Sequence, residues 1–83
     1  MAATFTFDGS YCRSSGKKHT YCYEAVWRDY GSDHVTWSAV VRRGYYFCGA
    51  TSGTVAAMST PRTLEMVREL VERSIEDLSG IRE

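Results

Sequence analysis

Polar and apolar side chains alternate along much of the first sixty residues, and this pattern predicts β-strands. The clearest strand runs from His19 to Arg28. Its more apolar face would carry His19, Tyr21, Tyr23, Ala25 and Trp27. A second strand is predicted from Val35 to Arg42, and its apolar face would carry Val35, Trp37, Ala39 and Val41. The segment between them, 30–34, contains the glycine and polar residues typical of a hairpin loop.

Shorter strands are predicted at 4–7, where Phe5 and Phe7 would share a face, and at 45–50. Glycine-containing segments at 8–10 and 51–53 are interpreted as a turn or bulge and as a break, respectively. Residues 14–18 form a polar loop, and Arg43-Gly44 is typical of a tight turn. Residues 54–58 are either a last edge strand or the approach to a helix.

The pattern changes after Pro61, where apolar residues recur at spacings of three and four. This period predicts an amphipathic helix over 61–79. Its apolar face would carry Leu64, Met66, Val67, Leu70, Val71, Ile75 and Leu78. Thr60 could accept a hydrogen bond from the first helical turn, Pro61 suits the first helical position, and Gly80 could end the helix. Such a helix needs another surface to cover its apolar side.

The strand face with the two tryptophans is the best candidate for that surface. It would carry Tyr23, Ala25, Trp27, Trp37, Ala39 and Val41, and the alanines would let the helix approach closely. The predicted architecture is therefore α+β, a three- to four-stranded antiparallel β-meander with one C-terminal helix packed across one face. Residues 1–83 would form a single domain, with the sheet at about 4–58 and the helix at about 61–79.

A single helix leaves the other sheet face uncovered. That face would carry Cys22, Val26, Val40 and either Tyr46 or Cys48, with charged residues at its margin. An apolar centre with a charged rim is typical of a partner-binding surface, although singly exposed apolar residues are also common on proteins without partners. Because so small a domain buries little surface by itself, we expect a homodimer formed through this face or through an edge strand, and a further protein partner could use the same surface.

Composition limits the class of protein. The ten basic and ten acidic residues cancel, and no apolar run is long enough to span a membrane. The first residues lack the pattern of a secretory signal, and three cysteines without a paired spacing argue against a disulfide framework. These features predict a cytoplasmic protein with reduced thiols.

Two groups of residues could in principle bind a metal ion. Asp29, Asp33 and His34 cluster around the predicted hairpin loop, where the alternative is a turn with local hydrogen bonds. Cys12, His19, Cys22 and Cys48 are the ligand types that zinc prefers, but His19 and Cys22 would point to opposite faces of their strand. We therefore predict no metal and no cofactor.

The chain also lacks the signs of an enzyme. No nucleophile motif such as Gly-x-Ser-x-Gly is present, and Ser32, Asp33 and His34 are adjacent in sequence rather than brought together by folding. A chain of this length has little room for a deep pocket. The prediction is a non-catalytic protein.

Arg43-Gly44-Tyr45-Tyr46-Phe47 is the most specific local feature. It partly resembles the RNP1 stretch of RNA-recognition motifs, which starts with a basic residue, glycine and an aromatic residue. Ala50 stands where that family has a further aromatic residue. The resemblance implies binding of single-stranded RNA or DNA, with Tyr45, Tyr46 and Phe47 stacking on bases and Arg42 and Arg43 meeting phosphates. The alternative is that these rings pack on the core and the sheet edge.

The order of three strands followed by one amphipathic helix is similar in outline to the small antitoxin-type modules of the HicB family. The acidic, glycine and proline residues that precede the last strand in that family are absent here. This similarity implies a regulatory module. The predicted function is a small non-catalytic interaction module that forms a homodimer; the alternatives are a single-stranded nucleic-acid binder and a HicB-like regulatory module.

Overall fold

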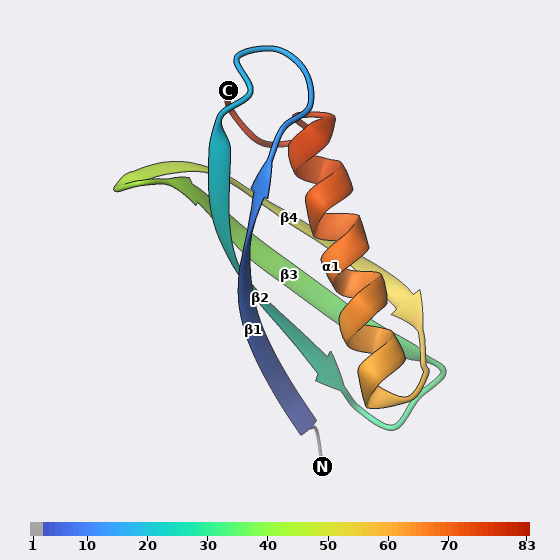
Figure 1. The fold of residues 1–83 in the computed structure, drawn as a ribbon. Coiled ribbons are helices and arrows are strands. Elements are labelled where there is room, and N and C mark those ends of the chain that lie inside the picture. Colours follow the sequence, from blue (N-terminus) through green and yellow to red (C-terminus); the bar gives the residue numbers. More distant parts are fainter. Residues whose placement is uncertain (1–2) are drawn as a thin grey trace.

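The computed structural model describes residues 3–83 and shows a four-stranded antiparallel sheet followed by one helix (Figure 1). The strands are β1 (Ala3–Cys12), β2 (Thr20–Asp29), β3 (His34–Arg43) and β4 (Tyr46–Ala56), and the helix is α1 (Thr60–Glu76). Neighbours in sequence are neighbours in the sheet, in the order β1-β2-β3-β4. The predicted α+β class and meander are therefore confirmed. None of the helical structure in residues 3–83 combines the length and the apolar character that crossing a membrane requires.

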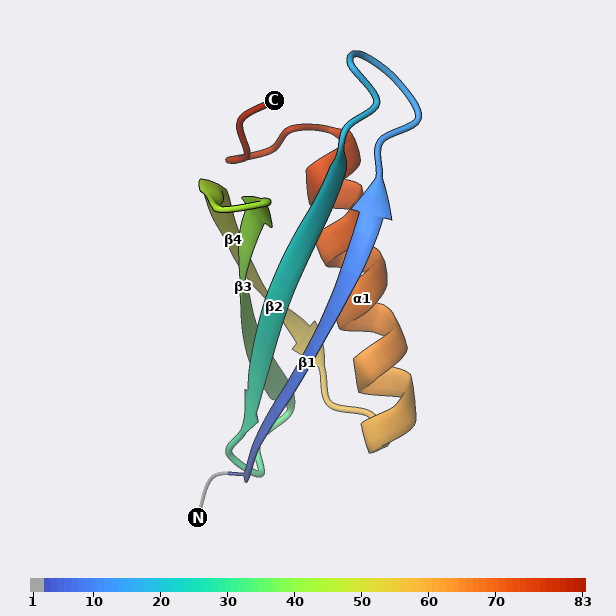
Figure 2. The same ribbon diagram turned by 60° about the vertical axis from the view of Figure 1, so that its left-hand side comes forward.

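The helix lies along one face of the twisted sheet (Figure 2). Val67, Val71 and Ile75 are completely buried, at the spacing of four that places them on one side of α1. They belong to one cluster with the paired strand residues Trp27 and Trp37. The expected contact between the helix and the tryptophans is confirmed, and Ala25 opposite Ala39 lies within the same cluster.

Two glycines lie inside strands, although their segments were interpreted as a turn or bulge at 8–10 and as a break at 51–53. Gly9 is directly opposite Tyr23, and Gly53 is directly opposite Trp37. A Cβ atom at Gly9 would lie 2.6 Å from the Tyr23 hydroxyl oxygen, and one at Gly53 would lie 3.0 Å from the Trp37 indole nitrogen. Each glycine leaves room for a large ring from the neighbouring strand, so β1 and β4 continue where we expected them to stop.

The helix is also shorter than predicted. It begins at Thr60 and ends at Glu76, and Leu78 already has a φ of 53°. Ser59, rather than Thr60, occupies the N-cap position, and its side chain makes no capping hydrogen bond. Instead, the Thr63 hydroxyl donates to the carbonyl oxygen of Ser59 at 3.0 Å. Met66, expected on the apolar face, is exposed.

The segment after the helix packs back on the sheet. Ile81 is 5% exposed and forms an isolated bridge with Gly49 of β4, and the Arg82 amide donates to the Cys48 carbonyl oxygen at 2.8 Å. This segment covers part of the outer edge of β4. No described segment pairs with the outer edge of β1.

Candidate binding surface at the β3–β4 hairpin

The β3–β4 hairpin extends beyond the body of the domain at the end where the chain finishes (Figure 1). Its turn contains Gly44, whose φ of 62° favours glycine, and a neighbouring tyrosine. Arg42 pairs with Phe47, and Arg43 pairs with Tyr46. Because directly opposed residues point to the same side of a sheet, each arginine lies beside an aromatic ring, one pair on each face of the hairpin.

The three aromatic side chains of this hairpin face solvent. Tyr45 is 103% exposed, Tyr46 73% and Phe47 56%. The sequence left open whether they pack on the core, and this alternative is wrong. The domain therefore exposes three large rings in succession at one projecting tip. Aromatic residues gathered in this way are typical of a binding surface.

Basic residues from three segments accompany the rings. Arg42 is exposed on β3, Lys17 and Lys18 are exposed in the β1–β2 loop, and Arg82 is exposed in the C-terminal segment next to Cys48. None of these four takes part in the two ion pairs formed among residues 3–83. No carboxylate of residues 3–83 therefore lies within ion-pair distance of these four side chains. Arg43, by contrast, is half-buried, and its guanidinium donates to the Glu83 carbonyl oxygen at 2.8 Å.

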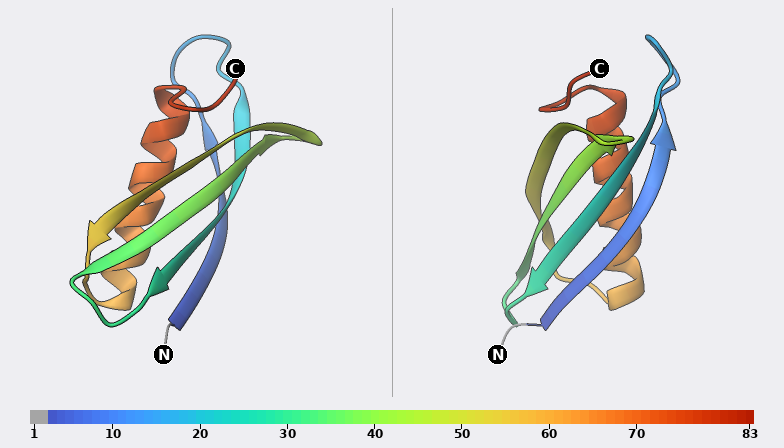
Figure 3. Two further views of the ribbon diagram at one scale, coloured as in Figure 1. Left: turned by 180° about the vertical axis from the view of Figure 1, so that it is seen from behind. Right: turned by 90° about the vertical axis from the view of Figure 1, so that its left-hand side faces the viewer.

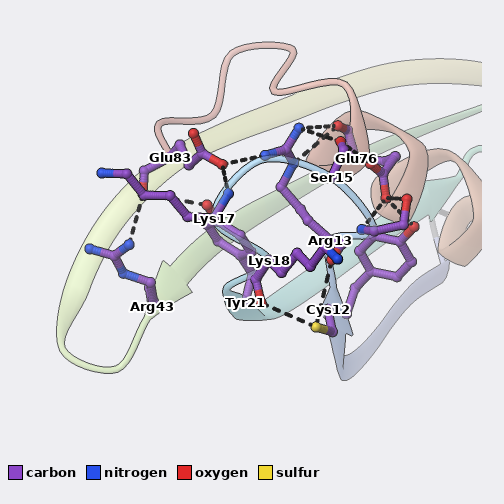
Figure 4. A network of polar contacts seen from close by, with 11 residues as sticks. Cys12, Arg13, Ser15, Lys17, Lys18, Tyr21, Arg43, Glu76 and Glu83 are labelled. Atoms are coloured by element: carbon purple, nitrogen blue, oxygen red, sulfur yellow. Dashed lines mark hydrogen bonds and ion pairs between the residues drawn. The ribbon is translucent and has the colours of Figure 1, made fainter.

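A polar network built around Arg13 holds these segments together (Figure 4). Arg13 is only 8% exposed, and its guanidinium donates to the Glu76 carbonyl oxygen at 2.9 Å and 3.1 Å and to the Glu83 carboxylate at 2.6 Å. The Lys17 amide also donates to that carboxylate, at 2.7 Å. This hydrogen bond is the largest cause that lowers the pKa of the Glu83 carboxylate, and the positive charge of Arg13 lowers it further. This network could not be predicted from the sequence, because its members are up to seventy positions apart.

Glu76 is the second anchor of this end. Its carboxylate accepts hydrogen bonds from the Ser14 amide at 2.8 Å, the Tyr11 hydroxyl at 2.7 Å and the hydroxyls of Ser14 and Ser15. The Ser14 amide is the largest cause that lowers the Glu76 pKa to about 2. The β1–β2 loop is thus fastened to the end of α1, which fixes the position of the basic residues it carries.

The left view of Figure 3 looks at the uncovered face of the sheet, with the helix behind it. The residues on this face differ from those of the expected partner face. Cys22 is exposed there, and Val26 and Val40 are half-buried in a shallow hollow that also contains Asp8 and Glu24. Cys48 does not belong to this face: it is 6% exposed and lies in the core cluster. The register shifts between Val41 and Arg42, so β4 has an extra residue here, and the usual alternation does not apply.

The residues considered for metal binding do not converge. Cys22 and Cys48 lie on opposite sides of the sheet, and no group of three ligand-type side chains comes together among residues 3–83. In the β2–β3 loop, the Asp29 carboxylate accepts from the Gly31 amide at 2.8 Å, and the Ser32 hydroxyl donates to the His34 carbonyl oxygen at 3.1 Å. These are the local bonds of a turn.

Fold and surface together define a small α+β domain with a helix on one sheet face and an aromatic, basic hairpin at one end. In comparisons with known proteins, no family model, no curated protein and no solved structure matches the chain.

Proposed function

We propose that this domain is a non-catalytic interaction module and that it binds single-stranded nucleic acid at the β3–β4 hairpin. The observation that supports this proposal is the exposure of Tyr45, Tyr46 and Phe47, two of them directly beside arginines. Exposed rings offer stacking platforms to unpaired bases of any sequence, and neighbouring cations meet the phosphates.

The charge around the hairpin favours a nucleic acid over an apolar protein groove. Lys17, Lys18, Arg42 and Arg82 are exposed at the same end, so a bound strand would find cations on more than one side of the rings. Phe47 with Arg42 lies on one face of the hairpin and Tyr46 with Arg43 on the other. A nucleic-acid strand that passes over the turn at Tyr45 could therefore contact both pairs of arginine and aromatic side chains.

Fluorescence anisotropy with labelled oligothymidine and oligouridine tests this proposal. Removing a stacking ring costs about 1–3 kcal/mol, so Tyr45→Ala and Phe47→Ala should each weaken binding by about 5- to 150-fold. Tyr30→Ala is the matched control, because Tyr30 is 58% exposed but lies in the β2–β3 loop at the other end of these strands. It should bind like the unaltered protein.

Salt dependence supplies the second readout. Each phosphate contact to a single strand contributes about −0.7 to the slope of log affinity against log salt concentration, so Arg42→Gln should reduce the slope by about that amount.

Absence of binding at about 50 mM salt would remove the proposal. Equal affinity for duplex DNA would contradict base stacking. Binding of a protein instead, with the same loss in Tyr45→Ala, would assign the hairpin to a different class of partner.

Self-association is a second proposed property, and it is supported by the free edge of β1. All ten residues of β1 pair with β2, while no described segment pairs on the other side (Figure 3, right). The uncovered face is less suitable than this edge, because Asp8 lies directly opposite Glu24 there and the two carboxylates carry like charge. Light scattering should return twice the 9.4 kDa chain mass at micromolar concentration, and a single chain mass at every concentration would refute the homodimer.

A further inference from the structure

The outer edge of β1 lacks the features that keep edge strands from pairing. Over Ala3–Cys12 there is no proline, lysine or arginine, and Asp8 is the only charged side chain. The pairing of β1 with β2 is continuous, without a bulge. Long, flat and nearly uncharged edges are templates for further strands. The opposite edge, on β4, has an irregular register at Val41/Arg42 and is covered by Ile81 at Gly49.

The aromatic row on the helix side of β1 is incompletely covered. Phe5 stacks on Trp27 with a 5.0 Å separation of ring centroids, and Phe7 meets Trp27 and Tyr23 edge-on. Both phenylalanines nevertheless remain half-buried because no strand lies beyond them. A strand added at this edge would extend the core and cover these rings.

Symmetry restricts how a second β1 can be placed. In an antiparallel pair, directly opposed residues point to the same side of the sheet. A two-fold axis perpendicular to the sheet keeps both helices on one side, so opposed residues must both be odd-numbered or both be even-numbered. One residue of β1 must then lie directly opposite its own copy, and the axis runs midway between these two copies. The central choices in β1 are Thr6, Phe7 and Asp8.

The three registers differ in charge and overlap. An axis at Asp8 places the two Asp8 carboxylates directly opposite each other, which is unfavourable. An axis at Thr6 pairs only residues 3–9. An axis at Phe7 pairs residues 3–11, a strand length of about 30 Å. It also places each Asp8 opposite the Thr6 hydroxyl of the partner, which can donate to it.

The aromatic row also favours the axis at Phe7. The two Phe7 rings would meet at the axis. Each Phe5 would lie opposite Gly9 of the other copy, where the ring of Tyr23 already occupies the space above the glycine. The rings of the two cores would then form one continuous row across the new edge, and aromatic pairs of this kind stabilise neighbouring strands.

We infer that two copies of this chain pair β1 to β1 in antiparallel orientation about Phe7, giving one continuous eight-stranded sheet with both helices on the same side. This inference rests on the proposed self-association and specifies its surface and register. It does not depend on the proposed nucleic-acid surface, because the β3–β4 hairpin contributes no residue to β1.

Site-directed disulfide formation distinguishes the registers. The background is Cys12→Ser with Cys22→Ser, because these two thiols are exposed whereas Cys48 is buried. Single-cysteine variants Thr6→Cys and Asp8→Cys are oxidised separately and as an equimolar mixture. Directly opposed residues of paired strands have the Cα separation that a disulfide requires. We expect a cross-linked dimer in the mixture and little from either variant alone. Thr54→Cys, exposed on β4, is the control and should not cross-link with Asp8→Cys.

Each other outcome overturns a defined part of this inference. Efficient cross-linking of Thr6→Cys alone would place the axis at Thr6. Cross-linking of Thr6→Cys with Ser10→Cys, a pair that keeps both Asp8 carboxylates, would place it at Asp8. A dimer by light scattering that forms no cross-link in the mixture would retain self-association but reject the β1 edge. A chain that stays monomeric would remove both the homodimer and the register.

Discussion

Gly49 should be one of the least replaceable residues of the chain, because of what lies beside it and not only because of its backbone conformation. Its φ is 150°, and a Cβ atom would overlap the Gly80 carbonyl oxygen and lie 3.0 Å from the Cα atom of Ile81. These are backbone atoms, which cannot rotate away as a side chain can. Gly49→Ala can therefore be accommodated only if the segment that follows α1 leaves the sheet.

The cost follows from what that segment contributes. Ile81 is 5% exposed, and full burial of an aliphatic side chain stabilises by about 1.5–3 kcal/mol. The hydrogen bond from the Arg82 amide to Cys48 adds about 1 kcal/mol. We expect Gly49→Ala to lower the free energy of unfolding by about 3.5–5 kcal/mol, including about 1 kcal/mol of backbone strain.

Gly44→Ala is the matched control. Gly44 also has a positive φ, 62°, but nothing lies within 4 Å of its missing Cβ. It should cost only the backbone strain, about 1 kcal/mol. Urea unfolding followed by circular dichroism measures both variants, and hydrogen exchange at the Arg82 amide, which donates to the Cys48 carbonyl oxygen, reports release of the segment. Equal losses for the two variants, or unchanged protection of the Arg82 amide, would show that the contact with Gly80 does not limit this position.

Two further predictions concern the polar contacts of the helix. The Tyr23 hydroxyl donates to the Glu72 carboxylate at 2.6 Å from a buried ring, so Tyr23→Phe should cost about 1–2 kcal/mol in urea unfolding, whereas Tyr30→Phe at an exposed site should change it by less than about 0.5 kcal/mol. The Glu76 pKa is lowered to about 2, so the folded state favours the ionised carboxylate; this contribution to stability is complete above about pH 4.5 and is lost as the pH falls towards 2. The urea midpoint of the unaltered protein should therefore fall more steeply over this interval than that of Glu76→Gln, and parallel curves would contradict the assignment.

Two periodic patterns in the sequence predicted the core correctly. The alternation at 19–28 and 35–42 identified the strands of the core, and the three-to-four spacing after Pro61 identified the helix that covers them. Both patterns arise because a strand repeats every two residues and a helix every 3.6, so a buried face appears directly in the sequence. The tryptophans of these strands lie where this argument placed them.

The errors have a common physical origin in neighbours that are distant in sequence. Gly9 and Gly53 resemble turn residues, but each is required inside a strand by the ring opposite, Tyr23 or Trp37. Cys48 was assigned to the wrong face because one extra residue in β4 changes the alternation. A short stretch of sequence does not reveal which residue lies opposite on the neighbouring strand or where a bulge occurs.

The candidate binding surface was predicted only in part. The cluster of aromatic and basic residues at 42–47 is visible in the sequence, but ring exposure depends on where the hairpin lies relative to the helix. The contribution of Arg82 and of the β1–β2 loop could not be predicted, because Glu83 and Arg13 bring these segments to the same end only in the folded chain.

The sequence by itself determined the class of fold, the core faces of β2 and β3 and the helix that covers them, since these follow from short-range periodicity and the burial of apolar area. Only the tertiary structure decided which strand keeps a free edge, which side of the sheet holds Cys48 and whether Tyr45 and its neighbours face solvent. Those properties depend on contacts between segments far apart in the chain, and such contacts exist only after the strands and the helix have packed together.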